Sequence, residues 1–137
     1  MSAHDPGIRG IHHVAIICRD YERSKRFYTE ALGLTIIAEN HRADRNSTKL
    51  DLAIPCGGML ELFSFPDPPP RPTQPEAVGL RHLAFRVDNL DGAIATFQSR
   101  GIPFEPVRTD PYTNRRHTFF RDPDDLPLEL YEDGPCE

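Results

Sequence analysis

The chain contains one short pattern twice, at nearly the same spacing. The first copy has His13 in an apolar stretch and Glu61 between two leucines, and the second has His82 and Glu129 in the same settings. His82 follows His13 by 69 residues and Glu129 follows Glu61 by 68, so the two histidine-to-glutamate separations agree to one residue. Self-similarity of this kind indicates a duplicated module of about 68 residues.

Length and composition limit the classes of protein to consider. A chain of 137 residues, 38% hydrophobic and 27% charged, is typical of a single soluble domain, here taken as residues 1–137. The formal net charge of −5 argues against a nucleic-acid partner, which requires a basic face. We find no apolar run near the ~20 residues that a membrane span needs. A small-molecule partner is therefore expected.

The cysteines suggest a reducing compartment. Cys18, Cys56 and Cys136 are odd in number and lack paired spacing. Disulfides are rare in the cytosol, so this usage predicts three reduced thiols in a cytoplasmic protein, with Cys18 in the core and Cys136 in a frayed tail.

Each module is expected to follow the order strand, helix, then three strands. Residues 10–18 alternate enough to form a strand that places His12 and His13 on opposite faces. Asp20 offers an N-cap and Gly33 a left-handed C-cap for a helix of about three turns. The remaining strands of the first module are expected at 34–39, 48–54 and 58–65.

The second module, residues 80–132, repeats the plan of the first, residues 10–65. Its predicted elements are a strand at 80–87, a helix from Asn89 or Leu90 to Arg100, and strands near 103–108, 116–121 and 126–132. The proline-rich segment 66–79 cannot join a central strand and is expected to act as a rigid extended connector. The predicted fold class is α+β, with two tandem βαβββ modules.

The repeated histidines and glutamates suggest a metal centre. If the repeat symmetry brings His13, Glu61, His82 and Glu129 together, two neutral imidazoles and two carboxylates would balance one divalent cation. Such a donor set suits Ni or Zn, with Co, Mn or Fe as alternatives, better than Ca or Mg. A single strand histidine is usually structural, so the prediction rests on all four positions together.

These residues together resemble the vicinal oxygen chelate superfamily, in its glyoxalase I-like group, close to the small bacterial members of the YaeR type. The resemblance covers residues 11–132. It is carried by His13 seven residues before Asp20, Ser-Lys-Arg-Phe-Tyr-Thr-Glu-Ala-Leu-Gly-Leu at 24–34, Leu60-Glu61-Leu62-Phe63, His82-Leu-Ala-Phe-Arg-Val-Asp88, and Asp122-Pro-Asp followed by Leu128-Glu129-Leu130.

The resemblance implies a curved mixed-sheet cup around one metal ion, often completed or shared in a homodimer. It implies that His13, Glu61, His82 and Glu129 are the ligands, and that the enzyme is a lyase or isomerase acting on a small α-oxo or α-hydroxycarbonyl compound through an enediolate. A metal-bound glutamate then moves the proton, with Glu129 the first choice and Glu61 the second. Whether each site lies within one chain or across two stays open.

Substrate identity is less constrained. Glutathione-using members of the group carry a basic residue where this chain has Ile17, and often a polar one where it has Phe65. These departures argue against lactoylglutathione formation, and use of another thiol adduct stays open. Arg116 and Tyr112 are the predicted substrate contacts. The alternatives are epimerisation, ring-cleaving dioxygenation, thiol transfer, or metal-free binding of a small molecule as in bleomycin-resistance proteins.

Overall fold

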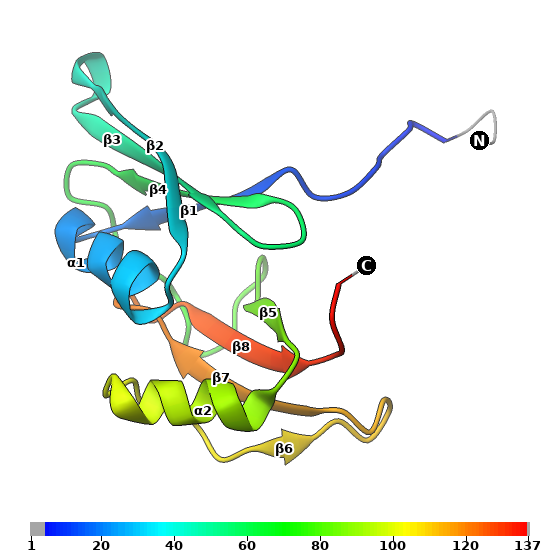
Figure 1. Cartoon of the computed structure of the whole chain (residues 1–137). Coiled ribbons are helices and arrows are strands. Elements are labelled where there is room, and N and C mark those ends of the chain that lie inside the picture. The colour runs from blue at the N-terminus through cyan, green and yellow to red at the C-terminus, as the bar shows by residue number, and fades with distance from the viewer. Residues whose placement is uncertain (1–4, 137) are drawn as a thin grey trace.

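The computed structural model describes residues 5–136, which form two four-stranded sheets, one above the other in Figure 1. Sheet A has the order β1 (His13–Cys18), β4 (Met59–Ser64), β3 (Ser47–Ala53), β2 (Thr35–Arg42). Sheet B has the order β5 (Leu83–Val87), β8 (Pro127–Glu132), β7 (Arg116–Arg121), β6 (Arg108–Thr109).

The two sheets have the same topology. In each, the first strand pairs in parallel with the last, and the other neighbours are antiparallel. A helix follows the first strand of each module: α1 (Tyr21–Arg26), which continues as the π-helical η1 (Phe27–Ala31), and α2 (Leu90–Ser99). The short 3-10 helix η2 (Ala43–Arg45) joins β2 to β3. The predicted α+β class with two βαβββ modules is confirmed.

The helix boundaries follow from their capping residues. Asp20 Oδ1 accepts a hydrogen bond from the Arg23 amide at 3.1 Å, and Gly33 has the predicted left-handed conformation, with φ of +76°. Asn89 caps α2 in the same way, accepting from the Gly92 amide at 3.0 Å. Within residues 5–136 no helix is long and apolar enough to cross a membrane.

One predicted strand is largely absent. The segment 103–108 was expected to be extended and paired, but β6 consists of Arg108–Thr109 alone. Pro103 and Pro106 have no backbone N–H, so a regular ladder cannot form there. The segment contacts β7 through Glu105, whose amide donates to the Phe119 carbonyl at 2.8 Å.

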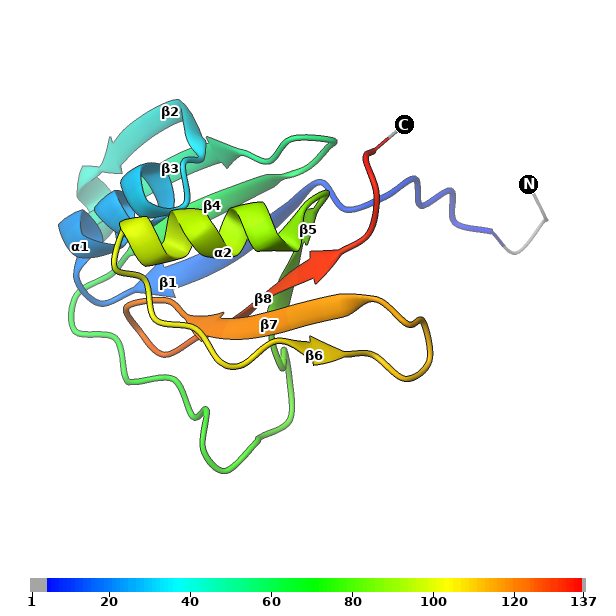
Figure 2. The ribbon, with the colours of Figure 1, turned by 60° about the horizontal axis from the view of Figure 1, so that its bottom comes forward.

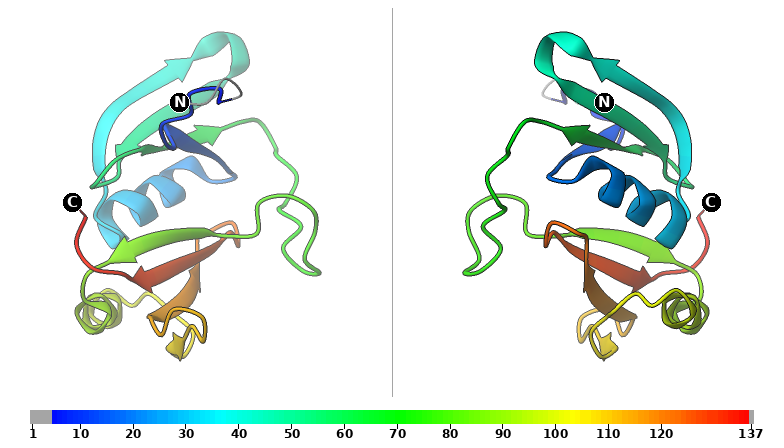
Figure 3. Two further views of the ribbon diagram at one scale, coloured as in Figure 1. Left: turned by 90° about the vertical axis from the view of Figure 1, so that its right-hand side faces the viewer. Right: turned by 90° about the vertical axis from the view of Figure 1, so that its left-hand side faces the viewer.

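The two sheets share one hydrophobic core. Leucines on alternate positions of β3, β4 and β8 pack with Tyr28, Phe97 and Phe120 in a single cluster of buried residues. In both views of Figure 3, α1 lies between the strands of sheet A and those of sheet B. The Phe27 ring reaches across, with its centroid 6.5 Å from that of Phe120. The core is therefore continuous between the modules.

A buried hydrogen bond links the modules. The Tyr28 hydroxyl, fully buried on η1, donates to Asp122 Oδ2 at 2.8 Å. Asp122 Oδ1 accepts from the amides of Asp124 and Leu126, both at 2.9 Å. Burial raises the pKa of the Asp122 carboxyl, and these donors oppose that rise. The turn before β8 is thus held against the helix of the other module.

We predict that Tyr28→Phe lowers the free energy of unfolding by about 1 to 3 kcal/mol, because Asp122 loses a buried donor. Urea titration followed by circular dichroism measures the change. Tyr112→Phe is the matched control, since Tyr112 is 95% exposed. Equal stability of the two variants would contradict the assigned role.

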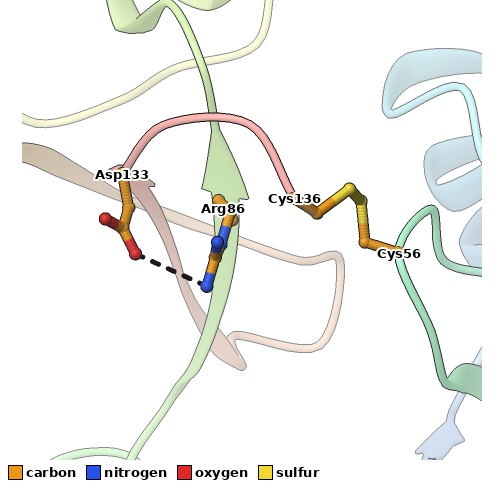
Figure 4. Close-up of a disulfide and its surroundings, with 4 residues drawn as sticks. All are labelled: Cys56, Arg86, Asp133 and Cys136. Carbon is orange, nitrogen blue, oxygen red and sulfur yellow. Dashed lines mark ion pairs between the residues drawn. A yellow bond between two sulfur atoms is a disulfide. The ribbon is translucent and has the colours of Figure 1, made fainter.

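The cysteines differ from expectation. Cys56, in the loop between β3 and β4, forms a disulfide with Cys136 in the C-terminal tail, as Figure 4 shows. The prediction of three reduced thiols is therefore wrong for this pair, and the thiol argument for a cytoplasmic location no longer applies. Cys18 is free and buried as predicted, and burial raises the pKa of its thiol to about 11.

The disulfide closes a loop between residues 80 positions apart. Because a cross-link of that span restricts the unfolded chain, Cys136→Ser should lower the free energy of unfolding by about 4 kcal/mol relative to the oxidised protein. Guanidinium titrations with and without reductant test this. Reductant should destabilise the parent protein and leave the variant unchanged; an unaffected parent would refute the prediction.

Candidate metal centre

Strand register places one histidine beside one glutamate in each sheet. In sheet A, Ala15 pairs with Glu61, so His13, two residues earlier, lies diagonal to Glu61 on the same face. His13 Nε2 is 3.5 Å from Glu61 Oε1. This pair is the first half-site.

Sheet B repeats the arrangement. Ala84 pairs with Glu129, and His82, two residues before Ala84, precedes β5 directly. His82 Nε2 is 3.8 Å from Glu129 Oε2. This second half-site has the same donors in the same register relation as the first, so the duplication seen in the sequence extends to the geometry of the side chains.

Both carboxylates are buried although they face away from the leucine core. Glu61 is 6% exposed and Glu129 is 8% exposed. The neighbouring imidazoles are more open, with side-chain exposures of 41% for His13 and 26% for His82. A buried carboxylate is costly without a compensating partner, so each half-site favours a cation or a donor at this position.

The surroundings of the two half-sites differ. Lys49 Nζ lies 3.6 Å from Glu61 Oε2 and 3.0 Å from Oδ1 of Asp51, which is paired directly opposite Glu61. The hydrogen bond to Asp51, and then its charge and that of Glu61, raise the pKa of the Lys49 ammonium. In sheet B, Phe119 stands opposite Glu129, and its ring meets the His82 ring edge-on at 5.1 Å. One half-site is polar and the other is aromatic.

The donor sets fit a divalent metal. Ligands bound at about 2.0 to 2.2 Å and at ordinary coordination angles stand ~3 to 3.5 Å apart. The observed separations of 3.5 and 3.8 Å are close to that range. Small side-chain rotations would bring each pair to one ion. His13 with Glu61, and His82 with Glu129, are therefore the residues that could hold it.

The four predicted ligands form two pairs rather than one cluster. Among residues 5–136, no three His, Cys, Asp or Glu side chains come together in a way that could hold a metal ion. The pairs belong to separate sheets whose leucine faces share the core. A four-ligand centre is therefore not assembled within one chain in this arrangement.

His12 departs from its expected position. Strand alternation placed it on the face opposite His13, but β1 begins only at His13. The His12 carbonyl still accepts from the Met59 amide at 3.1 Å, and the His12 Nδ1 lies 2.8 Å from Nδ1 of His13. His12 thus contacts the ring of a candidate ligand.

The two predicted substrate contacts have different surroundings. Arg116 has the strand parity of the buried Thr118, and its guanidinium is engaged by Glu132 at 3.1 Å and Asp91 at 3.0 Å beside α2. Because β7 alternates, this is the face opposite Phe119. Arg116 is thus paired with carboxylates on the face away from Phe119, which does not support its predicted contact with substrate. Tyr112 is 95% exposed in the loop between β6 and β7.

The sequence did not reveal a cavity beside His82. It measures about 170 Å³ and lies between the proline-rich segment 66–79 and sheet B. Its walls come from segments that are distant in sequence, so no spacing of residues within one segment predicts it. Figure 2 shows this segment looping out after β4 before it returns to β5.

Comparison with known proteins identifies the family. Residues 10–130 match the model of the Glyoxalase/Bleomycin resistance protein/Dioxygenase superfamily. The chain belongs to this superfamily. It is 58% identical to the uncharacterized protein YwkD of Bacillus subtilis, covering 91% of this chain and 98% of that protein. It is 55% identical to the uncharacterized protein YaeR of Escherichia coli, covering 92% and 98%.

A solved structure and a more distant relative extend the comparison. The crystal structure of the glyoxalase family protein from Enterococcus faecalis superimposes with a TM-score of 0.83 at 48% identity, covering 90% of this chain and 98% of that one. The lactoylglutathione lyase of Schizosaccharomyces pombe is 27% identical over 88% of this chain and 46% of its own length. The superfamily thus includes enzymes, and the glyoxalase fold is shared.

Proposed function

We propose that this superfamily member is a divalent-metal-dependent lyase or isomerase of the glyoxalase type, acting on a small α-oxo or α-hydroxycarbonyl compound. The observation that carries the proposal is the repeated half-site: a histidine diagonal to a buried glutamate, in the same register, in both sheets. Similarity to a lactoylglutathione lyase supports the reaction class. Ni or Zn is the expected ion, with Co, Mn or Fe as alternatives.

The complete site is proposed to lie between two copies of the chain. His13 and Glu61 of one copy would meet the partner's His82 and the partner's Glu129 in a twofold homodimer, which generates two equivalent sites. Two observations support this arrangement. The described part of one chain holds no cluster of three potential ligands, and the His13 face of sheet A is open, with Ile17 55% exposed.

A metal held by these residues supplies Lewis-acid stabilisation of the charge that develops when a C–H beside a carbonyl loses its proton. The chain supplies the proton acceptor. Lys49 Nζ lies 3.6 Å from Glu61 Oε2, whereas the residue paired opposite Glu129 is the apolar Phe119. Glu129 is therefore the carboxylate that can more easily move away from its histidine and carry a proton between adjacent carbons. Glu61 would remain a metal ligand, and it is the second choice for the base.

Metal content tests the ligand assignment. Elemental mass spectrometry of protein purified without chelator should find about one equivalent of divalent transition metal per chain. His82→Ala and Glu129→Gln should lose most of it, because each removes a donor from the set of four. His41→Ala, on β2, is the control and should retain the metal. Full metal content in the ligand variants, or none in the reconstituted parent, would contradict the proposal.

Isotope exchange tests the base. Proton NMR in D₂O should show exchange of the carbon-bound hydrogens of hydroxyacetone, or of thiol hemithioacetals, catalysed by the metal-loaded protein. Rates normalised to bound metal should fall by about 100-fold or more in Glu129→Gln, since general bases contribute 10² to 10⁴. If Glu61→Gln lost more of the exchange rate than Glu129→Gln, Glu61 would be assigned as the base. If the parent protein catalysed no exchange, proton transfer on these compounds would be excluded.

A further inference from the structure

The cavity beside His82 has walls from two parts of the chain. Sheet B contributes Phe119 and Arg121 from β7, His82 lies just before β5, and the segment 66–79 contributes Arg71 and its neighbours. The Phe119 ring that lines this space also contacts His82 and stands opposite Glu129. The cavity therefore adjoins the second half-site directly.

The segment 66–79, expected to be a rigid extended connector, is also hydrogen-bonded to the second module. Thr73 is 7% exposed, and its hydroxyl donates to the Asp125 carbonyl at 2.9 Å. Arg71 Nε donates to the Thr73 hydroxyl at 3.1 Å, and its Nη2 donates to the Leu80 carbonyl at 2.5 Å. These bonds tie the segment to the turn before β8 and to the approach to β5. Both views of Figure 3 show its course beyond the sheets.

The charged groups around the cavity are predominantly basic. Arg71, Arg81, Arg108 and Arg121 line it together with only two carboxylates, those of Glu76 and Glu105. This excess is unusual in a chain whose net charge is −5. A concave surface with an excess of positive charge attracts anionic ligands.

The arginines differ in how their charge is compensated. Arg81 pairs with Glu76 at 2.8 Å, Arg108 with Glu105 at 2.5 Å, and Arg121 with Asp125 at 3.2 Å. The hydrogen bonds of Arg71 instead go to a hydroxyl and to backbone carbonyls, which are neutral. Its guanidinium is thus ordered by the protein without a carboxylate in those bonds.

We propose that this cavity binds the anionic group of the substrate, a small organic acid or phosphate ester whose reacting carbonyl lies toward His82 and Glu129. As a statement about substrate, this rests on the proposed function. Pockets for drug-sized ligands usually measure about 300 to 1,000 Å³. A cavity of about 170 Å³ suits a molecule of a few carbon atoms rather than a tripeptide thiol adduct.

NMR titration of the ¹⁵N-labelled full chain tests the site, with pyruvate and inorganic phosphate as anionic probes and hydroxyacetone as a neutral one. Each titration is run on protein as purified and after metal removal. Saturable shifts are expected at the amides of Arg71, His82 and Phe119 for at least one anion, in both metal states. The anion that binds more tightly distinguishes a carboxylate from a phosphate ligand.

Variants locate the binding. Arg71→Gln should weaken anion binding by about tenfold, the loss expected for one charge-assisted contact. Because Arg71 also holds the linker, Arg121→Gln, which removes the pair with Asp125, provides a second reduction in positive charge. Arg45→Gln, in η2 beside sheet A, is the charge-matched control and should change affinity by less than about twofold.

Unaltered affinity in both cavity variants, equal binding of hydroxyacetone, or no saturable binding would overturn the inference. Because anion binding is also measured without metal, the test of the cavity is independent of the test of the proposed enzyme. A protein that takes up no metal but binds anions would contradict the proposed lyase and support the anion-binding cavity. A metal-loaded, active enzyme whose anion affinity is unchanged by these substitutions would support the proposed lyase and contradict the anion-binding cavity.

Discussion

The parallel pairing of the first and last strand in each module is the constraint on which the candidate site depends. Parallel neighbours align residues in fixed register, so Ala15 opposite Glu61 and Ala84 opposite Glu129 determine where each histidine lies. Strand alternation then separates two functions. Leucines on either side of each glutamate enter the core, and the glutamate itself is presented with the histidine on the other face.

The shared core has a consequence for assembly. Because both leucine faces pack into one cluster, and Tyr28 is hydrogen-bonded to Asp122 across the modules, the two half-sites remain separate within the described chain. A second copy is the simplest source of the missing pair, since a twofold axis supplies each half-site with its complement. The cavity beside His82 would then lie along one side of the proposed site.

The sequence predicted those parts of the structure that local pattern controls. The helix cap at Asp20 and the left-handed Gly33 follow from residue chemistry, and the duplication carried the strand order from one module to the other. Histidine and glutamate at repeat-related positions predicted one four-ligand centre, whereas the structure brings them together as two pairs in separate sheets. Local pattern also misled at 103–108, where prolines interrupt the ladder.

Other features depend on segments distant in sequence. No spacing rule joins Cys56 to Cys136, which meet only because the β3–β4 loop and the tail converge. Arg116 was chosen for its neighbours, but strand parity directs it to Asp91 and Glu132 instead. The arginine-lined cavity forms where the segment 66–79 folds back, which its proline content alone does not indicate.

Subunit complementation tests the central claim, that four ligands from two copies form one centre. One chain would carry His13→Ala with Glu61→Gln, the other His82→Ala with Glu129→Gln, each with a different purification tag. A shared site predicts metal-free homodimers and a heterodimer with about half the metal of the parent dimer, because one of its two sites is intact. A metal-free heterodimer, beside a metal-loaded parent, would contradict a site shared between chains.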